Sequence, residues 1–413
     1  MTPEHDPHHP ASRALAGTTI LQIVPTLAAD WLGRATLDIA TALLRAGARA
    51  VVASPDGPLV GDLQALGAQW VEVDPGTLSP LRAHRQRDAL AALTASERFD
   101  VVHAVGNRAA RLGLKIARTG RRPLATTYVG VPRGMPMLSL RGPEPMARGD
   151  VVIAFSEYAA DLIAAHRAIP RERIEVIHGC VDVAQFDPEA VAPGRAEALR
   201  AAWRIPPTDR VVLAPGRLAG ENGQMPLVDA ARILVNGGLR HTTFVIAGVP
   251  KRRESVARAL EKRVVAQGVR PLFRRVGHCA DMPALYALAD FVVLPLEHMP
   301  YFSTTAAEAQ AMARPLVVTR TGALPEYVRA PPRDFEGLRT GWIVQPGDPL
   351  DLARGLAAAL ALTPQALGAV SARARALAIA KFSRQHNTGA TLAIYARLLD
   401  RTTAPIASAQ GED

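Results

Sequence analysis

The chain has 413 residues and a formal net charge of +10, and 48% of its residues are hydrophobic. That length exceeds the size at which a single hydrophobic core keeps growing, so two domains are expected. The composition excludes an intrinsically disordered chain, and no apolar run reaches the ~18 residues that a membrane-spanning helix needs.

The cysteine content and the charge indicate in which compartment the protein works and what kind of partner it binds. Cys180 and Cys279 are the only cysteines, too few for a disulfide framework or a structural zinc site, and they fit the reducing cytoplasm. The first 15 residues lack a basic segment followed by an apolar one, which predicts a flexible start without a signal peptide. The arginine-rich positive charge suits sugar diphosphates, acidic lipid surfaces or nucleic acid, although arginine-rich codon usage gives the same balance. Nucleic acid is not expected, because basic and aromatic positions are not interleaved.

The first half of the chain alternates apolar runs of strand length with helical patterns. Strand-like runs lie at 18–24, 49–54, 99–105 and 150–156, and helical patterns at 36–47, 59–67, 108–118 and 158–166. Such alternation predicts a parallel sheet covered by helices on both faces. His103, inside one of these strands, is more readily a core histidine with satisfied hydrogen bonds than a catalytic one.

The pattern restarts after a break at residues 176–195. Strand-like runs at 210–216, 242–248, 271–277 and 290–296 alternate with helical patterns at 223–238 and 254–268. The sequence therefore predicts two doubly wound α/β domains, over 16–187 and 188–380. A helix at 381–403 is free to pack back on the first domain, and residues 404–413 form a flexible tail. Ligands on such sheets bind beyond the carboxyl ends of the strands, so a cleft between two facing sheets is expected.

Arg217 follows the predicted strand RVVLA and stands at its carboxyl end. A guanidinium there can bind a diphosphate through two parallel hydrogen bonds and stabilise it as a leaving group. A solvated loop arginine is the alternative.

The stretch 294–328 predicts strand, loop, helix, strand and turn. The amides of Ser303, Thr304 and Thr305, at a helix N-terminus, are suited to phosphate oxygens. Glu308, one turn into the helix, can accept hydrogen bonds from two ribose hydroxyls. Thr305 and Glu308 also have the spacing of a capping box, which is the structural alternative.

Gly322 and Glu326 repeat the strand, turn and helix pattern after the next strand. We interpret them as further donor-binding residues. The alternative is a turn glycine and an acidic residue favoured by the helix dipole.

Motifs along nearly the whole chain resemble the family 4 glycosyltransferases. They include GRL…NGQ, VGHCADMPALYALAD, YFSTTAAEAQAMARP and TGALPE in the second half, and TLDIATALLRAG, FDVVHAV and MARGDVVIAFSEY in the first. The resemblance implies a GT-B fold and a retaining enzyme that uses a nucleotide sugar. It also implies a donor bound mainly by the second domain, an acceptor bound mainly by the first, and no cofactor or obligatory metal.

By position, the resemblance assigns Arg217 to the donor diphosphate, Glu308 to the ribose, and the amides at 303–305 to phosphate oxygens. The backbone near His278 and Cys279 would flank the base. Several positions depart from the family pattern: Pro300 replaces an acid, Asn222 a lysine and Val129 a histidine, Asp30 and Trp31 replace paired glycines, and Ser303 and Ala313 replace single glycines.

These departures weaken the expected sugar contacts more than the expected nucleotide contacts. Asn222 cannot supply the ammonium that offsets diphosphate charge, and Val129 and Pro300 remove groups near the transferred sugar. Glu297 can bring a carboxylate into the place vacated at Pro300, with a solvated Glu297-His298 pair as the alternative. We therefore count Glu297, Val129 and Asp30 as candidate sugar or acceptor contacts.

Basic residues concentrate in the first half of the chain, at Arg82, Arg85, Arg87, Arg108, Arg111, Lys115, Arg118, Arg121 and Arg122. A helix with Leu112, Leu114 and Ile116 among these charges can lie on anionic lipid at the inner face of the membrane. A solvated helix face is the alternative.

The resemblance and the residues together predict a cytoplasmic glycosyltransferase. It would use a UDP- or GDP-linked sugar and a glycolipid or saccharide acceptor, in envelope polysaccharide or glycolipid synthesis. The alternatives are a catalytically silent relative that binds a nucleotide or a partner enzyme, and a nucleotide-sugar 2-epimerase.

Overall fold

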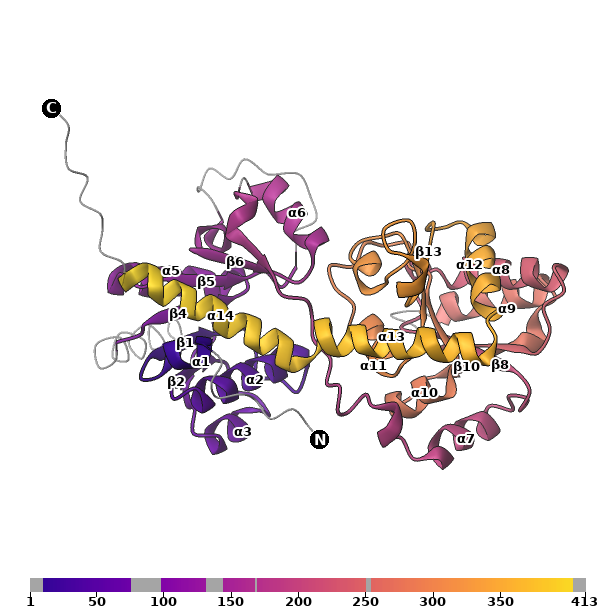
Figure 1. Ribbon diagram of the computed structural model, residues 1–413, viewed down its shortest axis with the longest axis horizontal. Helices are drawn as coiled ribbons and strands as arrows, with labels where there is room; N and C mark the ends of the chain where they lie inside the picture. The colour runs from indigo at the N-terminus through magenta and orange to yellow at the C-terminus, as the bar shows by residue number, and fades with distance from the viewer. Residues whose placement is uncertain (1–9, 76–97, 131–143, 168, 250–253, 404–413) are drawn as a thin grey trace. The chain divides into compact units, whose positions relative to one another are not determined.

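The computed structural model describes residues 10–75, 98–130, 144–167, 169–249 and 254–403 (Figure 1). The chain divides into two compact units, Met1–His178 with Arg384–Asp413, and Gly179–Ser383. Each unit is built on one sheet whose described strand pairs are all parallel. The prediction of two doubly wound α/β halves is confirmed.

The first unit contains a seven-stranded sheet with the order β3-β2-β1-β4-β5-β6-β7. The strands are β1 Thr19–Ile23, β2 Arg49–Ser54, β3 Gln69–Glu72, β4 Val101–Val105, β5 Leu124–Thr127, β6 Val151–Ala154 and β7 Ile174–Val176. The strand-like runs of the sequence correspond to β1, β2, β4 and β6. The other three have only three or four residues each, too short for a period to stand out.

The helices of the first unit cover both faces of this sheet. Those among the described residues are α1 Pro10–Leu15, α2 Trp31–Arg45, α3 Val60–Ala65, α5 Asn107–Gly120, α6 Glu157–Arg167 and α14 Arg384–Thr403. Residues of α2, α3 and α14 share a buried cluster with Val101 and Val105 of β4. Alternate residues of a strand point to opposite faces, and Gly113 of α5 accordingly packs on Val102 and Ala104.

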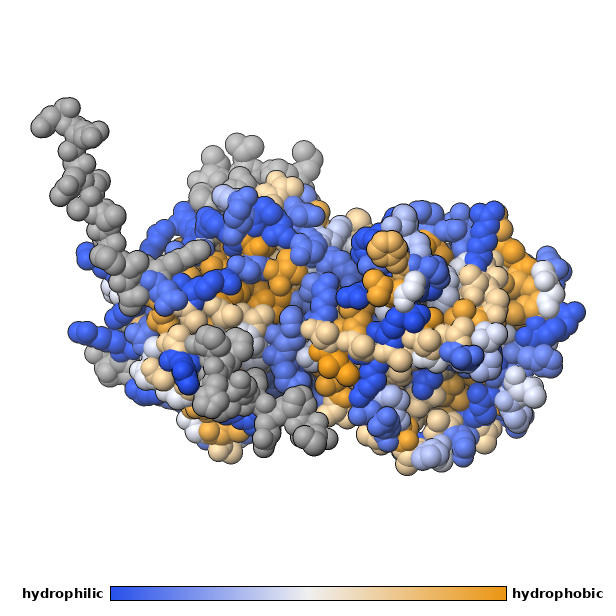
Figure 2. All heavy atoms as spheres, viewed as in Figure 1, coloured by the Kyte–Doolittle hydropathy of each residue, from blue (hydrophilic) through white to orange (hydrophobic). Residues whose placement is uncertain are grey.

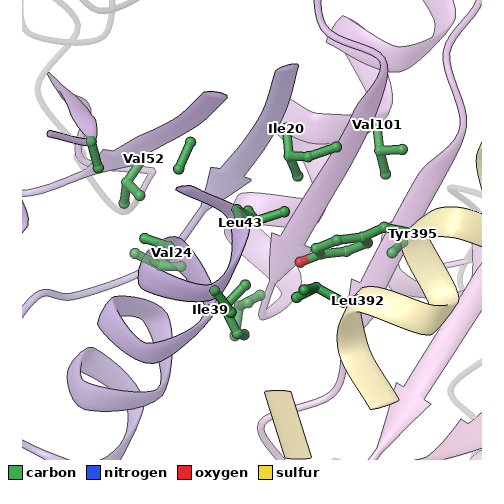
Figure 3. Close-up of a cluster of buried hydrophobic side chains, with 14 of the residues drawn as sticks. Ile20, Val24, Ile39, Leu43, Val52, Val101, Leu392 and Tyr395 are labelled. Atoms are coloured by element: carbon green, nitrogen blue, oxygen red, sulfur yellow. The ribbon is translucent and has the colours of Figure 1, made fainter. Parts of the chain in front are cut away.

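The C-terminal helix α14 belongs to the core of the first unit. It lies beside α1 and α2 (Figure 1). Its side chains Leu392 and Tyr395 point into the cluster formed with Ile20 and Leu43 (Figure 3). The predicted flexible start is wrong for residues 10–15, because these form α1 and Leu15 is fully buried in the same cluster.

The second unit contains a six-stranded sheet with the order β10-β9-β8-β11-β12-β13. The strands are β8 Arg210–Pro215, β9 Thr242–Ala247, β10 Phe273–Gly277, β11 Phe291–Leu294, β12 Leu316–Thr319 and β13 Gly341–Val344. The helices are α7 Pro193–Ala202, α8 Gln224–Asn236, α9 Glu254–Ala266, α10 Met282–Leu288, α11 Thr304–Ala311, α12 Pro349–Leu360 and α13 Pro364–Phe382. One buried cluster joins α8, α9 and α12 to the sheet, while α11 packs against α13, and α10 against α7.

The boundaries of the units differ by a few residues from those predicted at 187/188 and 380/381. Residues 179–187 belong to the second unit, because the Val181 amide donates to the Phe382 carbonyl at 2.8 Å and Asp187 pairs with Arg375 at 2.9 Å. Helix α13 also continues to Phe382 before α14 begins at Arg384. The predicted tail at 404–413 lies outside the described residues, and the predicted cleft between the two sheets stays a prediction.

Within the described ranges, no single helix is long and apolar enough to cross a membrane, although α12 and α13, bent at 108°, pass that test as a pair. Helix α12 packs its residues Leu352, Ala353 and Leu356 into the core of the second unit. On the face shown in Figure 2, hydrophilic and hydrophobic residues are interspersed, as is usual for folded proteins whose surface is largely apolar.

Candidate functional site

The predicted donor residues gather at the carboxyl edge of the six-stranded sheet. The chain proceeds outward from β8 through β9 to β10 and then starts again at β11, on the other side of β8. Ligands of doubly wound sheets bind at such a switch point. The loops after β8 and β11 meet there, because the Glu297 amide donates to the Glu221 carbonyl at 2.9 Å. A Cβ on Gly223 would lie 1.7 Å from the Pro295 oxygen, so this approach requires glycine.

Arg217 stands in the loop after β8, where the sequence places it. Its carbonyl accepts hydrogen bonds from Asn222 Nδ2 at 2.5 Å and Gln224 Nε2 at 3.1 Å. Its side chain is exposed and, among the described residues, has no ion-pair partner. The backbone of Arg217 is therefore fixed while the guanidinium is available to an anion.

Asn222 has a structural role that sequence analysis did not assign. Its side-chain amide holds the Arg217 carbonyl, so this position shapes the loop that presents the arginine. Binding of the donor by Asn222 itself stays a prediction.

Helix α11 begins at Thr304, within the stretch predicted as a helix N-terminus. Ser303 is its N-cap, and the Ser303 hydroxyl accepts a hydrogen bond from the Ala306 amide at 3.1 Å. The Ser303 amide already donates to the Tyr327 hydroxyl at 3.0 Å. The amides of Thr304 and Thr305 lie in the first turn, where the helix offers no carbonyl. Of the three predicted phosphate-binding amides, these two are placed to receive an anion, and that of Ser303 is engaged.

Glu308 does not form the capping box that was its structural alternative. The N-cap is Ser303 rather than Thr305, so Glu308 lies too far along the helix to reach back to the N-cap amide. Instead, the Tyr286 hydroxyl of α10 donates to Glu308 Oε2 at 2.9 Å. Burial raises the pKa of Glu308, and the hydrogen bond from Tyr286 opposes that rise. Glu308 is therefore a half-buried carboxylate whose second oxygen can accept further hydrogen bonds.

Gly322 and Pro300 form one closely packed turn. Gly322 has φ 53°, and a Cβ there would lie 2.4 Å from the Pro300 oxygen. The Pro300 carbonyl also accepts from the Ala323 amide at 2.8 Å. The helix that follows is a 3-10 helix, Leu324–Tyr327, rather than an α-helix, and Glu326 lies within it, half-buried. Close packing against Pro300 thus explains the glycine at position 322, in agreement with the alternative that Gly322 is a turn glycine.

The remaining candidates of the second unit lie in neighbouring loops at the same edge. His278 is exposed after β10, and the Cys279 thiol donates to the Asp281 carbonyl at 3.5 Å. Burial raises the pKa of Cys279, which keeps the thiol protonated. Glu297 is exposed after β11, and His298 Nδ1 lies 3.2 Å from the Glu221 carbonyl oxygen.

In the first unit, Asp30 is the N-cap of α2, and its side chain accepts from the amides of Leu32 and Gly33. Trp31 packs edge-on against Phe155 at 5.2 Å between ring centroids. Val129 is half-buried against the core. At the position where Asp30 replaces a glycine of the family pattern, the structure therefore has a helix cap. A sugar or acceptor contact by Asp30 or Val129 stays a prediction.

His103 has satisfied hydrogen bonds in the core, as its structural reading predicted. It is 3% exposed, with Nδ1 2.7 Å from the Tyr395 hydroxyl and Nε2 2.7 Å from Thr127 Oγ1. Burial lowers the pKa of His103 to about 4.

Two family models match the chain. The model described as Glycosyltransferase Family 4 matches residues 32–185, and that described as Glycosyl transferases group 1 matches residues 209–361. The chain belongs to the family 4 glycosyltransferases.

Curated relatives of this glycosyltransferase include D-inositol 3-phosphate glycosyltransferases. That of Mycolicibacterium vanbaalenii is 30% identical over 277 residues, which cover 64% of this chain and 56% of the relative. That of Mycobacterium marinum is 28% identical over 259 residues, which cover 62% of this chain and 51% of the relative. The chain thus spans about half the length of the curated relatives it matches.

Solved structures share the fold across nearly the whole chain. A glycosyltransferase from Rickettsia africae superposes with a TM-score of 0.75 at 22% identity, covering 92% of this chain and 98% of its own. Anabaena HepE in complex with UDP superposes with a TM-score of 0.65 at 20% identity, covering 93% of this chain and 98% of its own. Together with the two doubly wound sheets, these likenesses establish a two-domain GT-B-like fold.

The sequence did not predict that two tyrosines of this glycosyltransferase contact the candidate site residues. Tyr286 holds Glu308, and Tyr327 accepts from the Ser303 amide. The available signal was a tyrosine in each of two apolar segments, since a buried tyrosine hydroxyl usually finds a polar partner.

Proposed function

We propose that the protein transfers a sugar from a UDP- or GDP-linked donor to a glycolipid or saccharide acceptor, with retention of configuration. The observation that carries the proposal is the position of Arg217 and Glu308 at one edge of the second sheet, in loops and helices on either side of its switch point. An arginine suits the diphosphate and a carboxylate suits the ribose diol.

The nucleotide is the part of the donor that these residues support best. The Arg217 guanidinium and the amides of Thr304 and Thr305 would offset the negative charge of a diphosphate as it leaves. We also propose that this role needs no obligatory metal, because Arg217 and the two amides offer positive charge to the diphosphate. UDP is the first nucleotide to test, because the Anabaena neighbour is named as a complex with UDP.

The acceptor is the less constrained partner. We propose a glycolipid or polysaccharide of the cell envelope as the acceptor. A phosphorylated polyol should be tested as an acceptor as well, because the curated relatives are named for inositol 3-phosphate. If the protein contacts the anionic inner face of the cytoplasmic membrane, we propose that α5 makes the contact. Its residues Arg108, Arg111, Lys115 and Arg118 are exposed at intervals of three and four positions, along one helical face.

The structure changes the kind of membrane contact that α5 could make. Leu112, Leu114 and Ile116 are half-buried, and the helix rests on the sheet through Ala109, Ala110, Gly113 and Ala117. Contact would therefore be electrostatic adsorption rather than insertion of aliphatic side chains. Arg82, Arg85 and Arg87, which sequence analysis added to this charge, lie outside the described residues.

A catalytically silent relative is the second candidate, and one observation favours it. Pro300 and Asn222, which replace an acid and a lysine of the family pattern, both have structural roles in this fold. A chain that had kept only nucleotide binding would be free to use these positions for packing. Glu297, exposed in the same loop as Pro300, is the candidate carboxylate for an active enzyme.

The deciding experiment measures UDP and GDP binding by calorimetry and then turnover of a panel of UDP- and GDP-sugars. Binding with turnover, and retained anomeric configuration by NMR, supports the transferase. Binding without hydrolysis or transfer supports the silent relative. If neither nucleotide binds at millimolar concentration, or if turnover survives Arg217→Ala combined with Glu308→Ala, both candidates are wrong.

A further inference from the structure

The hydrogen bond between Tyr286 and Glu308 joins two helices of the second unit. Tyr286 of α10 is fully buried, and its hydroxyl donates to Glu308 Oε2 of α11 at 2.9 Å. This hydrogen bond therefore holds one carboxylate oxygen of α11 against α10.

Packing fixes the Tyr286 ring independently of its hydroxyl. Phe186 lies edge-on to the ring, with centroids 6.0 Å apart and planes at 67°. Arg375 Nη1 of α13 donates to the Phe186 carbonyl at 3.1 Å and to the Ala311 carbonyl, at the end of α11, at 2.6 Å. The ring and α11 are thus held in place from the same helix. A phenylalanine at position 286 would keep this packing and remove only the hydroxyl.

The hydroxyl acts on the charge of Glu308 as well as on its direction. Burial favours the neutral acid, and the Tyr286 hydrogen bond favours the carboxylate. The neighbouring elements also carry the titratable groups Arg375, Glu326 and Tyr327. Among the described residues, only the Tyr286 side chain shifts the pKa of Glu308 in addition to burial. Arg375 is paired with Asp187.

A carboxylate has about four lone-pair sites, and Tyr286 occupies one of them on Oε2. The others remain for a vicinal diol, which donates two hydrogen bonds. We propose that Tyr286 is a positioning residue for nucleotide binding: it orients Glu308 toward the ribose hydroxyls of a nucleoside diphosphate and keeps it an acceptor. This inference rests on the proposed function, in which Glu308 binds the ribose.

The test compares UDP with 2′-deoxy-UDP by calorimetry between pH 5 and 8, in the wild type and in Tyr286→Phe. The ratio of the two affinities isolates the ribose contact and cancels the titration of the phosphates. Losing a hydrogen bond to a charged group should weaken UDP about tenfold at neutral pH, with a smaller loss for 2′-deoxy-UDP. The preference for UDP should be lost as the pH is lowered and Glu308 takes up a proton. Because the pKa of Glu308 rises when the hydroxyl is removed, this loss should occur at a higher pH in Tyr286→Phe than in the wild type.

Tyr395→Phe is the matched control. It removes another buried tyrosine hydroxyl, one that contacts His103 in the first unit, and should leave both the ratio and its pH dependence unchanged. Equal weakening of both nucleotides by Tyr286→Phe, with an unshifted pH profile, would reduce Tyr286 to a packing residue. If Tyr286→Phe does not fold, Tyr286→Met decides, because it also removes the hydroxyl and its flexible side chain can fill the space of the ring. An unchanged ratio and profile in that variant would overturn the inference.

Failure of the proposed function has a different signature. If wild-type protein does not bind UDP, or if Glu308→Ala binds UDP and 2′-deoxy-UDP as the wild type does, the ribose role of Glu308 is wrong. If Glu308→Ala abolishes the preference for UDP and Tyr286→Phe leaves it intact, only the role of Tyr286 is wrong.

Discussion

His103 Nδ1 lies 2.7 Å from the hydroxyl oxygen of Tyr395, and this contact joins β4 to α14 across 292 positions of sequence. The second ring nitrogen of His103 lies 2.7 Å from Thr127 Oγ1 on β5. A neutral imidazole serves both hydroxyls, as donor to one and acceptor from the other. The C-terminal helix is therefore tied to the first sheet by a polar contact inside an otherwise apolar cluster.

This contact predicts an acid-sensitive first unit. Burial lowers the pKa of His103 to about 4, whereas the unfolded chain binds the proton near pH 6.5. Between these values the unfolded state holds more protons, so stability is fully present above pH 6.5 and falls as the pH is lowered toward 4. The loss amounts to about 3 kcal/mol. We expect the melting temperature to fall across this window, and to fall less steeply in His103→Asn. A variant with the wild-type slope would contradict the assignment.

Gly322 offers a test of the turn at Pro300. Gly322→Ala should destabilise the protein by more than about 1 kcal/mol, because φ is 53° and the new Cβ would lie 2.4 Å from the Pro300 oxygen. Gly368, inside α13, is the matched control, because a Cβ added there would meet no atom within 4 Å other than those of its chain neighbours and its own helix backbone. Gly368→Ala should stabilise by about 0.5–1 kcal/mol. Denaturant unfolding of both variants checks the pair, and equal effects would contradict it.

The charged form of Glu308 should lower the stability of the fold while it strengthens UDP binding. Because burial raises its pKa above the ordinary 4.5, the charged carboxylate costs stability at neutral pH, and this cost disappears as the pH falls and the group takes up a proton. Glu308→Gln should therefore melt at a higher temperature than the wild type at pH 7.5, by a margin that shrinks toward pH 4.5. The same variant should bind UDP more weakly. A lower melting temperature at pH 7.5 would show that the charge is stabilising.

The alternation of strands and helices was predictable where apolar runs are long, because apolar periodicity is a local property of the sequence, whereas short strands such as β3, β5 and β7 were missed. The positions of Arg217, Pro300 and Gly322 followed from it, since the carboxyl ends of parallel strands meet at one edge. The partners of individual polar groups were not predictable. Tyr286 and Glu308 are 22 positions apart on different helices, and only the packing of α10 and α11 on the sheet brings them together.

The same limit applies at the start of α11. Local spacing allowed Thr305 as the helix cap with Glu308 as its reciprocal partner, which was the structural alternative to ribose binding. The structure uses Ser303 instead, and its amide finds Tyr327 from a segment that follows the next strand. Spacing along one helix could not reveal that contact.

Metal independence is a further expected outcome. In our proposal the Arg217 guanidinium and the amides of Thr304 and Thr305 neutralise the diphosphate. UDP affinity should therefore be unchanged by chelator, whereas Arg217→Ala should weaken UDP by about tenfold or more. Calorimetry with EDTA and with added magnesium checks this. A strict magnesium or manganese requirement would show that Arg217 is not the principal ligand of the diphosphate.

Asn222 allows the missing lysine of the family pattern to be restored. Because the Asn222 amide holds the Arg217 carbonyl at 2.5 Å, any substitution loosens this loop, and Asn222→Ala measures that loss alone. Asn222→Lys suffers the same loss and adds an ammonium near the diphosphate, where a charged hydrogen bond contributes up to ~3 kcal/mol. We therefore expect the lysine variant to bind UDP more tightly than the alanine variant, and the difference to shrink with added salt.

The combination of Pro300→Glu with Val129→His should act on a different step. These positions correspond to the sugar side of the family pattern, so restoring them should change turnover more than UDP affinity. In an active enzyme, transfer should rise in the double variant and rise again with Asn222→Lys. In a silent relative, Asn222→Lys would tighten UDP binding without any transfer. Lysine and alanine variants with equal affinities at low salt would show that residue 222 does not face the diphosphate, and the donor would then have to lie elsewhere on the sheet edge.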